Sequence, residues 1–335
     1  MTKVTVLGSG AWGTTMAQVL CDAGNDVLMW GRNQNVVEEV NSHHTNAAYL
    51  PNISLPASLV ATTNLDEAFA HSKIYVLAIP AQTLRSNLEE WKPFIASDAI
   101  LVSTLKGIEV TTQFRMSEVI HDVLAADESR IAIITGPNLA LELARREPAG
   151  AVAAGSSDEL AHTLQKLFTT SYYRVYTSTD ILGCEMAGAV KSVIALGVGM
   201  AVGLDLGENT QAMLITRGLN EVARLAAAHG ADPLSIAGLA GMGDLVASCS
   251  SPLSRNRSFG EAVSRGGSME YARKHVGTTV EGVSSASAVV ELAHRVGVEV
   301  PVIEAVADVV AGHITTQEAL IRLMGISTRS EDFIK

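Results

Sequence analysis

The sequence is short of basic residues, cysteines and aromatic side chains. Its formal net charge is −11 and it has no basic tract, which argues against a protein that binds nucleic acid through its phosphates. The three cysteines, Cys21, Cys184 and Cys249, lie far apart and form no metal-binding motif. No His/Cys cluster indicates a metal either, so we expect none. Because the cysteines are few and no signal peptide precedes them, we expect reduced thiols and a cytoplasmic location.

Only one stretch is long and apolar enough to resemble a membrane span. It covers residues 187–204 (AGAVKSVIALGVGMAVGL), which is about the minimum spanning length. Lys191 lies inside this stretch, glycines interrupt its apolar surface, and no bias of Lys and Arg flanks it. We interpret it as a helix buried inside a globular protein and expect no membrane span. Lys191 is then a buried charge that needs an explanation.

The length and the first half of the chain predict an α/β domain. With 335 residues, of which 47% are hydrophobic and 18% charged, the chain is long enough for two compact domains. Short apolar strands alternate with amphipathic helices, which is typical of a doubly wound, mostly parallel sheet covered on both faces. We place this domain at residues 1–183. Its strands are predicted at Val4–Leu7, Val27–Trp30, Val60–Thr62, Ile74–Ile79, Ile100–Ser103, Ile131–Ile134, Ala149–Ala154 and Tyr173–Tyr176.

The second half of the chain lacks strand patterns and predicts an all-helical domain over residues 184–335. Its Ala-, Leu- and Gly-rich segments have the helical period of apolar residues. The apolar character of this domain favours a homodimer. The helices are predicted at Gly183–Gly203, Thr210–His229, Asp232–Gly238, Ser258–Gly266, Ser284–Val296, Val302–Gly312 and Thr316–Met324.

The first predicted strand leads directly into a glycine fingerprint, GSGAWG at residues 8–13. Gly8 permits a tight turn out of the strand, and Gly10 lets the backbone approach a pyrophosphate. Gly13 lets the following helix pack close to the sheet, with its N-terminus directed at the phosphates. Because a strand precedes the motif and an amphipathic helix follows it, the motif predicts a Rossmann-like dinucleotide site.

Arg32 indicates which dinucleotide binds. Sites selective for NAD usually place a carboxylate near the end of the second strand, where it binds the ribose 2′-hydroxyl. Here that position is Gly31-Arg32-Asn33, without a carboxylate. A guanidinium suits a 2′-phosphate, so we expect NADP(H) to be accepted alongside NAD(H). The alternative is an arginine that is only solvated at the surface.

Two further polar segments follow predicted strands at the same edge of the sheet, where ligands gather in such folds. Lys106 follows the strand at Ile100–Ser103, and Gly136-Pro137-Asn138 follows the strand at Ile131–Ile134. Lys106 places an ammonium at this edge, although a solvated lysine explains its position equally well. Free N–H groups after Gly136 suit a carbonyl or a phosphate, but ordinary helix capping also accounts for these residues.

Lys191 has the environment that a proton-transfer lysine needs. An unpaired lysine in an apolar helix costs several kcal/mol unless its pKa falls or a carboxylate meets it. A lowered pKa lets an ammonium give and take a proton near neutrality. The alternative is a structural salt bridge.

A second block of polar residues lies between residues 241 and 257. Asp244 is placed in a glycine loop, GMGDL, where it can partner a catalytic ammonium. Ser254, Arg255 and Asn256 begin a predicted helix and supply a guanidinium, an amide and N-terminal N–H groups. Each has a capping or surface interpretation when taken alone. Together they predict a receptor for a phosphate monoester, and hence a small phosphorylated substrate.

From end to end, the combined motifs resemble the bacterial-type NAD(P)-dependent glycerol-3-phosphate dehydrogenases. The later block is specific, because few other families join GDL, SRN and VEG behind a Rossmann fingerprint. The matching motifs are GSGAWGT at 8–14, STLKG at 103–107, TGPN at 135–138, GAVKSVIALGVGM at 188–200, RGLNE at 217–221, GMGDLVASCSSPLSRNRSFG at 241–260 and VEG at 280–282.

The resemblance implies roles for individual residues. Lys191 would be the general acid/base at the substrate oxygen, Lys106 would touch both the substrate and the nicotinamide end of the cofactor, and Asp244 would hold the ammonium. The substrate site would be lined by Lys106, Gly136, Asn138, Lys191, Asp244, Ser254, Arg255 and Asn256, with Arg255 on the phosphate. Besides Gly8, Gly10, Gly13 and Lys106, the cofactor site would be lined by Ala11, Trp12, Arg32, Ala140, Arg255, Thr279 and Glu281.

The implied reaction is the reversible NAD(P)H-dependent reduction of dihydroxyacetone phosphate to sn-glycerol 3-phosphate, which supplies glycerophospholipid synthesis. Two departures from the family stand out: Asn138-Leu139 replaces Ser or Thr followed by Phe, and Ser248 replaces Thr. Both keep a polar side chain at the polar position, so the activity is expected to persist. The alternatives are a related two-domain 3-hydroxyacid dehydrogenase and a non-catalytic NAD(P)H sensor.

Overall fold

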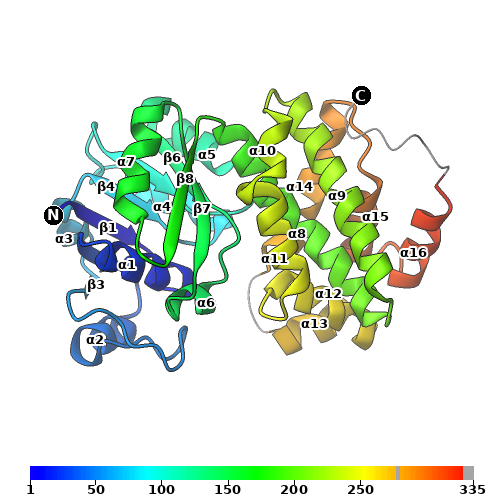
Figure 1. The fold of residues 1–335 in the computed structure, drawn as a ribbon, viewed down its shortest axis with the longest axis horizontal. Coiled ribbons are helices and arrows are strands. Elements are labelled where there is room, and N and C mark those ends of the chain that lie inside the picture. Colours follow the sequence, from blue (N-terminus) through cyan, green and yellow to red (C-terminus); the bar gives the residue numbers. More distant parts are fainter. Residues whose placement is uncertain (277–279, 327–335) are drawn as a thin grey trace. The chain divides into compact units, whose positions relative to one another are not determined.

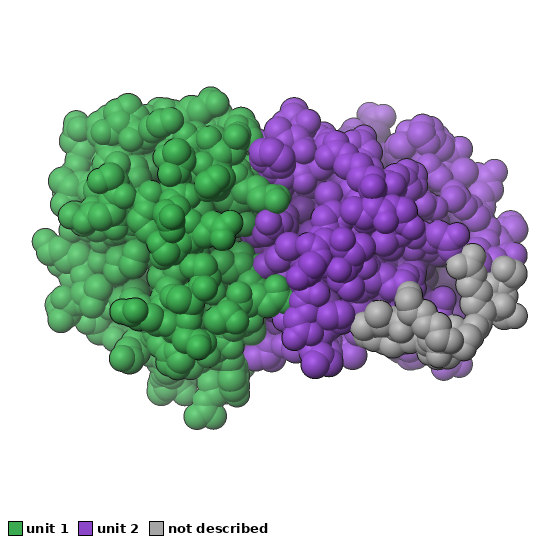
Figure 2. Space-filling view, turned by 90° about the horizontal axis from the view of Figure 1, so that it is seen from above, with its two compact units in different colours: residues 1–105, 116–181 green, residues 106–115, 182–335 purple. Residues whose placement is uncertain are grey.

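The computed structural model describes residues 1–276 and 280–326, and Figure 1 shows its strands and helices. The chain divides into two compact units, which Figure 2 draws in different colours. Unit 1 comprises residues 1–105 and 116–181. Unit 2 comprises residues 106–115 and the chain from residue 182 onward. The short segment 106–115, placed by the sequence in the first domain, therefore packs with the second unit.

Unit 1 is built on an eight-stranded sheet in the order β3-β2-β1-β4-β5-β6-β7-β8. All neighbouring strands are parallel except β6 and β7, so the predicted doubly wound, mostly parallel sheet is confirmed. The order reverses beside β1, and ligands of such sheets bind at that reversal. The strands are β1 (Lys3–Leu7), β2 (Asp26–Trp30), β3 (Val60–Thr62), β4 (Ile74–Leu77), β5 (Ile100–Ser103), β6 (Ile131–Thr135), β7 (Ala149–Gly155) and β8 (Tyr173–Ser178).

Helices cover both faces of this sheet, because successive strand residues point to opposite sides. Val76 of β4 belongs to a buried cluster with Met16 of α1 and Leu164 of α7. Its neighbour Tyr75 packs instead against Phe69 of α3, edge to face. The helices of this unit are α1 (Ala11–Asp22), α2 (Gln34–His43), α3 (Leu65–His71), α4 (Leu84–Trp91), α5 (Met116–Leu124), α6 (Ala140–Ala144) and α7 (Asp158–Phe168), with short 3-10 turns at Ala81–Thr83 and Glu128–Arg130.

Unit 2 has no strand among its described residues, and the predicted all-helical region is confirmed. Two of its helices, α11 and α13, were not predicted, because glycine and serine interrupt the apolar period around them. The helices are α8 (Ile181–Gly203), α9 (Glu208–Ala228), α10 (Pro233–Ala237), α11 (Asp244–Ser250), α12 (Arg255–Gly266), α13 (Met269–Val276), α14 (Glu281–Arg295), α15 (Pro301–Ala311) and α16 (Thr316–Met324), with a π turn at Leu239–Gly243.

The long apolar helix α8 is the core of unit 2. Of its most apolar 18-residue window, 89% is buried, which confirms the interpretation of this stretch as a core helix. Glycines let the neighbouring helix α12 approach closely. A Cβ at Gly199 would lie 2.0 Å from the carbonyl oxygen of Arg257, and one at Gly260 would lie 2.1 Å from that of Leu196. This close packing fixes the position of α8 against α12.

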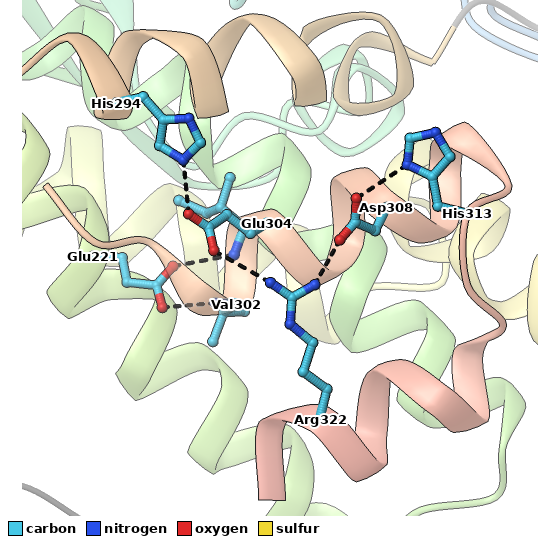
Figure 3. Close-up of polar contacts among 8 residues, drawn as sticks. Glu221, His294, Val302, Glu304, Asp308, His313 and Arg322 are labelled. Carbon is cyan, nitrogen blue, oxygen red and sulfur yellow. Dashed lines mark hydrogen bonds and ion pairs between the residues drawn. The ribbon is translucent and has the colours of Figure 1, made fainter. Parts of the chain in front are cut away.

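A buried carboxylate joins α9 to α15. The Glu221 oxygens accept hydrogen bonds from the backbone N–H groups of Val302 (2.8 Å) and Ile303 (3.1 Å), at the N-terminus of α15. Burial raises the pKa of Glu221 to about 7. Glu304 on the same helix lies 3.5 Å from the Arg322 guanidinium, and Figure 3 shows this contact. Glu221 lies in the RGLNE motif, and this contact gives the motif a structural role.

Candidate active site

The glycine fingerprint adopts the geometry that a bound dinucleotide requires. Gly8 has φ of +131°, and a Cβ there would lie 2.3 Å from the carbonyl oxygen of Ala78. A Cβ at Gly13 would lie 2.0 Å from the carbonyl oxygen of Gly8, so α1 packs tightly on the turn. The space around Gly10 is open, and no acidic residue lies in the first turn of α1. A pyrophosphate can therefore approach the backbone at Gly10 and the N-terminus of α1.

Asn46 supports the fingerprint, although no sequence pattern marks it. Its side-chain amide donates to the backbone carbonyl of Ser9 (3.0 Å) and to the Thr14 hydroxyl (2.8 Å), and the residue is fully buried. Asn46 follows α2 in a stretch without helical or strand periodicity, where nothing distinguishes it from a loop residue. It holds the glycine turn from a segment more than thirty residues away.

The other predicted residues of unit 1 lie after strands, as expected. Arg32 is exposed, two residues beyond the end of β2. Gly136 and Asn138 lie between β6 and α6, and Ala140 begins α6. Both polar atoms of the Asn138 side-chain amide are buried and make no hydrogen bond within the part of the chain that the structure describes. Buried amide atoms of this kind call for a polar partner, which a bound ligand group would provide.

In unit 2, one carboxylate holds two lysines. Asp244 accepts a hydrogen bond from Lys191 at 2.6 Å through Oδ1 and from Lys106 at 2.7 Å through Oδ2. The Asp244 side chain is 2% exposed, that of Lys191 9% and that of Lys106 18%. The structure thus brings together the three residues predicted to carry the chemistry. Lys106, the most exposed of them, lies at the outer side of the cluster.

Burial lowers the pKa of the Lys191 ammonium toward neutrality. Burial is the main cause that lowers the pKa of Lys191 to about 8, the charge of Lys106 lowers it further, and Asp244 opposes both. Lys191 therefore has the carboxylate partner of a salt bridge and also a pKa close to neutrality. A group with such a pKa is able both to donate and to accept a proton.

Ser248 is a second hydrogen-bond partner of Lys191, after Asp244, and it was noted in the sequence only as a departure from the family. The Lys191 ammonium donates to Ser248 Oγ at 2.6 Å. Asp244 begins α11 and does not lie in an open glycine loop as predicted, because the π turn at Leu239–Gly243 runs directly into the helix. Residues 244 and 248 are four apart on α11, so both side chains face Lys191.

The predicted phosphate receptor lies at the N-terminus of α12. Ser254 caps this helix by accepting a hydrogen bond from the backbone N–H of Arg257 (3.3 Å), and Arg255 is its exposed first residue. Asn256 Oδ1 accepts from the backbone N–H of Gly282 (3.0 Å), which joins the SRN motif to the VEG motif. Glu281 begins α14, whereas the predicted cofactor residue Thr279 lies outside the described residues.

A doubly wound sheet with this glycine turn, together with a helical unit in which one buried carboxylate binds two lysines, defines a nicotinamide-dependent dehydrogenase. Family models extend this assignment over nearly the whole chain. The model of the N-terminal part of NAD-dependent glycerol-3-phosphate dehydrogenase matches residues 3–161, and that of the C-terminal part matches residues 180–321. The chain belongs to the NAD(P)-dependent glycerol-3-phosphate dehydrogenase family.

Individual relatives match the chain at full length. The glycerol-3-phosphate dehydrogenase of Thermobifida fusca is 50% identical over 334 residues, which is 99% of both chains. That of Corynebacterium glutamicum strain R is 50% identical over 332 residues, covering 99% of this chain and all of the relative. Among solved structures, glycerol-3-phosphate dehydrogenase from Coxiella burnetii has a TM-score of 0.91 at 31% identity, covering 97% of this chain and 99% of that one.

Proposed function

We propose that the protein reversibly reduces dihydroxyacetone phosphate to sn-glycerol 3-phosphate with NADPH or NADH. The observation that carries this proposal is the buried cluster in which Asp244 holds Lys191 at 2.6 Å and Lys106 at 2.7 Å. It provides one ammonium poised for proton transfer and a second positive charge next to it. Full-length relatives are named glycerol-3-phosphate dehydrogenase [NAD(P)+], which supports glycerol 3-phosphate as one of the two substrates.

In the proposed reduction, Lys191 donates a proton to the carbonyl oxygen of the substrate as negative charge builds there. Lys106 stabilises the developing alkoxide, and Asp244 keeps both ammonium groups in position. Lys191 is then neutral and regains a proton before the next turnover. In the reverse direction, neutral Lys191 removes the proton from the hydroxyl. Bound NADPH or NADH supplies the hydride that the carbonyl carbon receives.

The phosphate of the substrate would bind at the N-terminus of α12. Arg255 supplies a guanidinium that can bind two phosphate oxygens, and Ser254 and Asn256 flank it. Gly136 and Asn138 would complete the substrate site, and the buried amide atoms of Asn138 support this role. Phosphate binding far from the reacting carbon converts binding energy into orientation of the carbonyl.

The cofactor would be held mainly by unit 1. The backbone around Gly8, Gly10 and Gly13 fits the pyrophosphate, and Arg32 fits a 2′-phosphate. Lys106 and Arg255 would also serve the cofactor. The remaining cofactor contacts are assigned to Ala11, Trp12, Ala140 and Glu281, with Thr279 as a further candidate.

The protein would work as a cytoplasmic homodimer that supplies the glycerol phosphate backbone of phospholipids. Exposed apolar side chains of the helical unit, among them Met213, Leu234 and Val246, would be available for self-association. Among the described residues, one helix is long and apolar enough to span a membrane, and 89% of its most apolar window is buried inside the protein.

The test is NADPH oxidation, followed by the loss of its absorbance, with dihydroxyacetone phosphate compared with unphosphorylated dihydroxyacetone. We expect rapid oxidation with the phosphorylated ketone and little with the other. If a 3-hydroxyacid pair is turned over instead, the substrate assignment is wrong. If NADPH binds and no substrate promotes its oxidation, the protein is a sensor.

A further inference from the structure

Lys106 contacts Asp244 from a short segment, residues 106–115, that belongs to unit 2 although the chain on both sides of it belongs to unit 1. The strand β5 ends at Ser103 in unit 1, and the chain enters unit 2 at residue 106 and leaves it after residue 115. The position of the Lys106 ammonium therefore depends on how residues 106–115 are bound to the helices of unit 2. Lys191 needs no such device, because it lies on the core helix α8.

The segment is folded tightly on itself. Ile108 and Arg115 form an antiparallel bridge, and the backbone N–H of Glu109 donates to the carbonyl oxygen of Phe114 (2.9 Å). Thr112 Oγ1 donates to the Glu109 carboxylate at 2.5 Å, which closes the loop from inside. Because Arg115 lies beside Ile108 in this bridge, whatever holds Arg115 also holds the backbone two residues from Lys106.

Besides the Lys106–Asp244 hydrogen bond, apolar and polar contacts bind the segment to the rest of unit 2. Ile108 is fully buried in the core cluster of the unit. The Arg115 guanidinium lies 2.7 Å from a carboxylate oxygen of Glu185 on α8, with side chains 17% and 6% exposed. Gln113 accepts a hydrogen bond from Arg295 of α14. Glu185 is six residues before Lys191, or about 9 Å along the same helix.

Resting on the proposed function, we propose that the Arg115–Glu185 ion pair positions Lys106 for the reaction by fastening its segment to the helix that carries Lys191. The pair is not explained by stability alone, because taking the buried Glu185 carboxylate and the partly buried Arg115 guanidinium out of water offsets much of their attraction. An apolar contact such as that of Ile108 lets the segment shift slightly against the core of unit 2, because apolar packing has no preferred direction. The ion pair instead fixes the distance between the segment and α8, and a displacement of about 1 Å at a reacting group can lower a rate a hundredfold.

The test uses the full-length protein with Glu185→Gln, Arg115→Met and the double variant. We expect each single change to lower kcat for dihydroxyacetone phosphate about ten- to a hundredfold, and the double change to lower it no further. As a matched control, Arg322→Gln breaks exposed ion pairs with Glu304 and Asp308 in the same unit and should leave kcat unchanged. Arg115→Lys keeps the charge with fewer donors and should have an intermediate effect.

A second readout separates positioning from folding. Displacing Lys106 removes a positive charge near Lys191. It also leaves Lys191 as the one lysine of the pair that still binds Asp244, and both changes raise the pKa of Lys191. We expect this rise in a titration of 13Cε-labelled lysine by NMR, with the Lys191 signal assigned by its loss in Lys191→Arg. If the variants lose only resistance to denaturant, with kcat and the Lys191 titration unchanged, the inference is overturned.

The same titration keeps this inference distinct from the proposed function. If the unchanged protein and Arg322→Gln both fail to turn over dihydroxyacetone phosphate, the proposed function is wrong. The Lys191 titration in Glu185→Gln then still decides whether the ion pair positions Lys106, because it requires no substrate. An unshifted signal would overturn the positioning inference whatever the substrate is.

Discussion

Ser248 Oγ lies 2.6 Å from the Lys191 ammonium and accepts a hydrogen bond from it. A hydroxyl in this position stabilises the charged form of the lysine, in the same direction as Asp244. Because burial lowers the pKa of Lys191 to about 8, the loss of any such partner moves it further down. We therefore expect the serine to help keep the lysine in its charged form.

We predict that Ser248→Ala shifts the pH dependence of catalysis. Hydrogen bonds to charged groups contribute about 1.5–3 kcal/mol, so the pKa of Lys191 should fall by about one unit or more. Carbonyl reduction needs the ammonium, and its loss of rate at alkaline pH should begin at a lower pH. The measurement is kcat/KM between pH 6 and 10 for the unchanged protein and Ser248→Ala. Ser248→Thr, which keeps the hydroxyl, is the control. An unshifted profile in the alanine variant would show that Ser248 does not tune Lys191.

Removing the Lys191 amine should stop proton transfer and leave the cofactor site intact. Lys191→Met keeps most of the buried stem without the ammonium, so it tests chemistry with little loss of packing. We expect kcat to fall by about two orders of magnitude or more. NADPH binding, followed by its fluorescence, should persist. A variant that remains active would remove Lys191 from the mechanism.

Arg255→Ala should chiefly raise the KM for dihydroxyacetone phosphate. A guanidinium on a phosphate contributes about 1.5–3 kcal/mol, so a rise of about ten- to a hundredfold is expected. Arg255→Lys keeps the charge without the paired donors, so its KM should lie between those of the unchanged protein and Arg255→Ala. If KM for the phosphorylated ketone does not change in Arg255→Ala, the phosphate binds elsewhere.

Arg32→Ala should discriminate between the two nicotinamide cofactors. Arg32 is exposed near the end of β2, where a 2′-phosphate would lie, and NADH lacks that phosphate. We expect the Kd for NADPH to rise about tenfold or more, with that for NADH nearly unchanged. Equal losses for both cofactors would leave Arg32 as a surface residue without a role in selectivity.

Glu221 should make the stability of the protein depend on pH. Burial raises its pKa in the folded protein to about 7 from an ordinary 4.5, while the hydrogen bonds from the Val302 and Ile303 backbone lower it. Between these values the folded state holds a proton that the unfolded state has lost, so stability contributed by this group falls as pH rises from 4.5 to 7.

The measurement is urea unfolding at pH 5 and pH 8 for the unchanged protein and Glu221→Gln. From pH 5 to pH 8, the unfolding free energy of the unchanged protein should fall by on the order of 1–3 kcal/mol more than that of the glutamine variant. The opposite trend would mean that the ionised carboxylate, held by the N-terminus of α15, is the stabilising form.

The sequence predicted most of the fold because its signals are local. Strand residues alternate with helices of clear period, so the eight strands were located within about two residues at each end. Glycine carried information where the backbone demands it, as at Gly8 with its positive φ and close neighbour. Lys191 was recognisable as a candidate because a charge in an apolar helix is costly.

Tertiary structure alone decided how the chemistry is assembled. Asp244 meets Lys106 and Lys191 across 138 and 53 residues, distances over which no periodicity relates side chains. The residue types of the cluster were readable from the sequence. One carboxylate binds both ammonium groups because two features of the fold bring them together. Helix α8 packs closely against its neighbours, and the segment 106–115 belongs to the helical unit. The contacts of Asn46 and Ser248 could not be predicted for the same reason, because they form only in the folded chain.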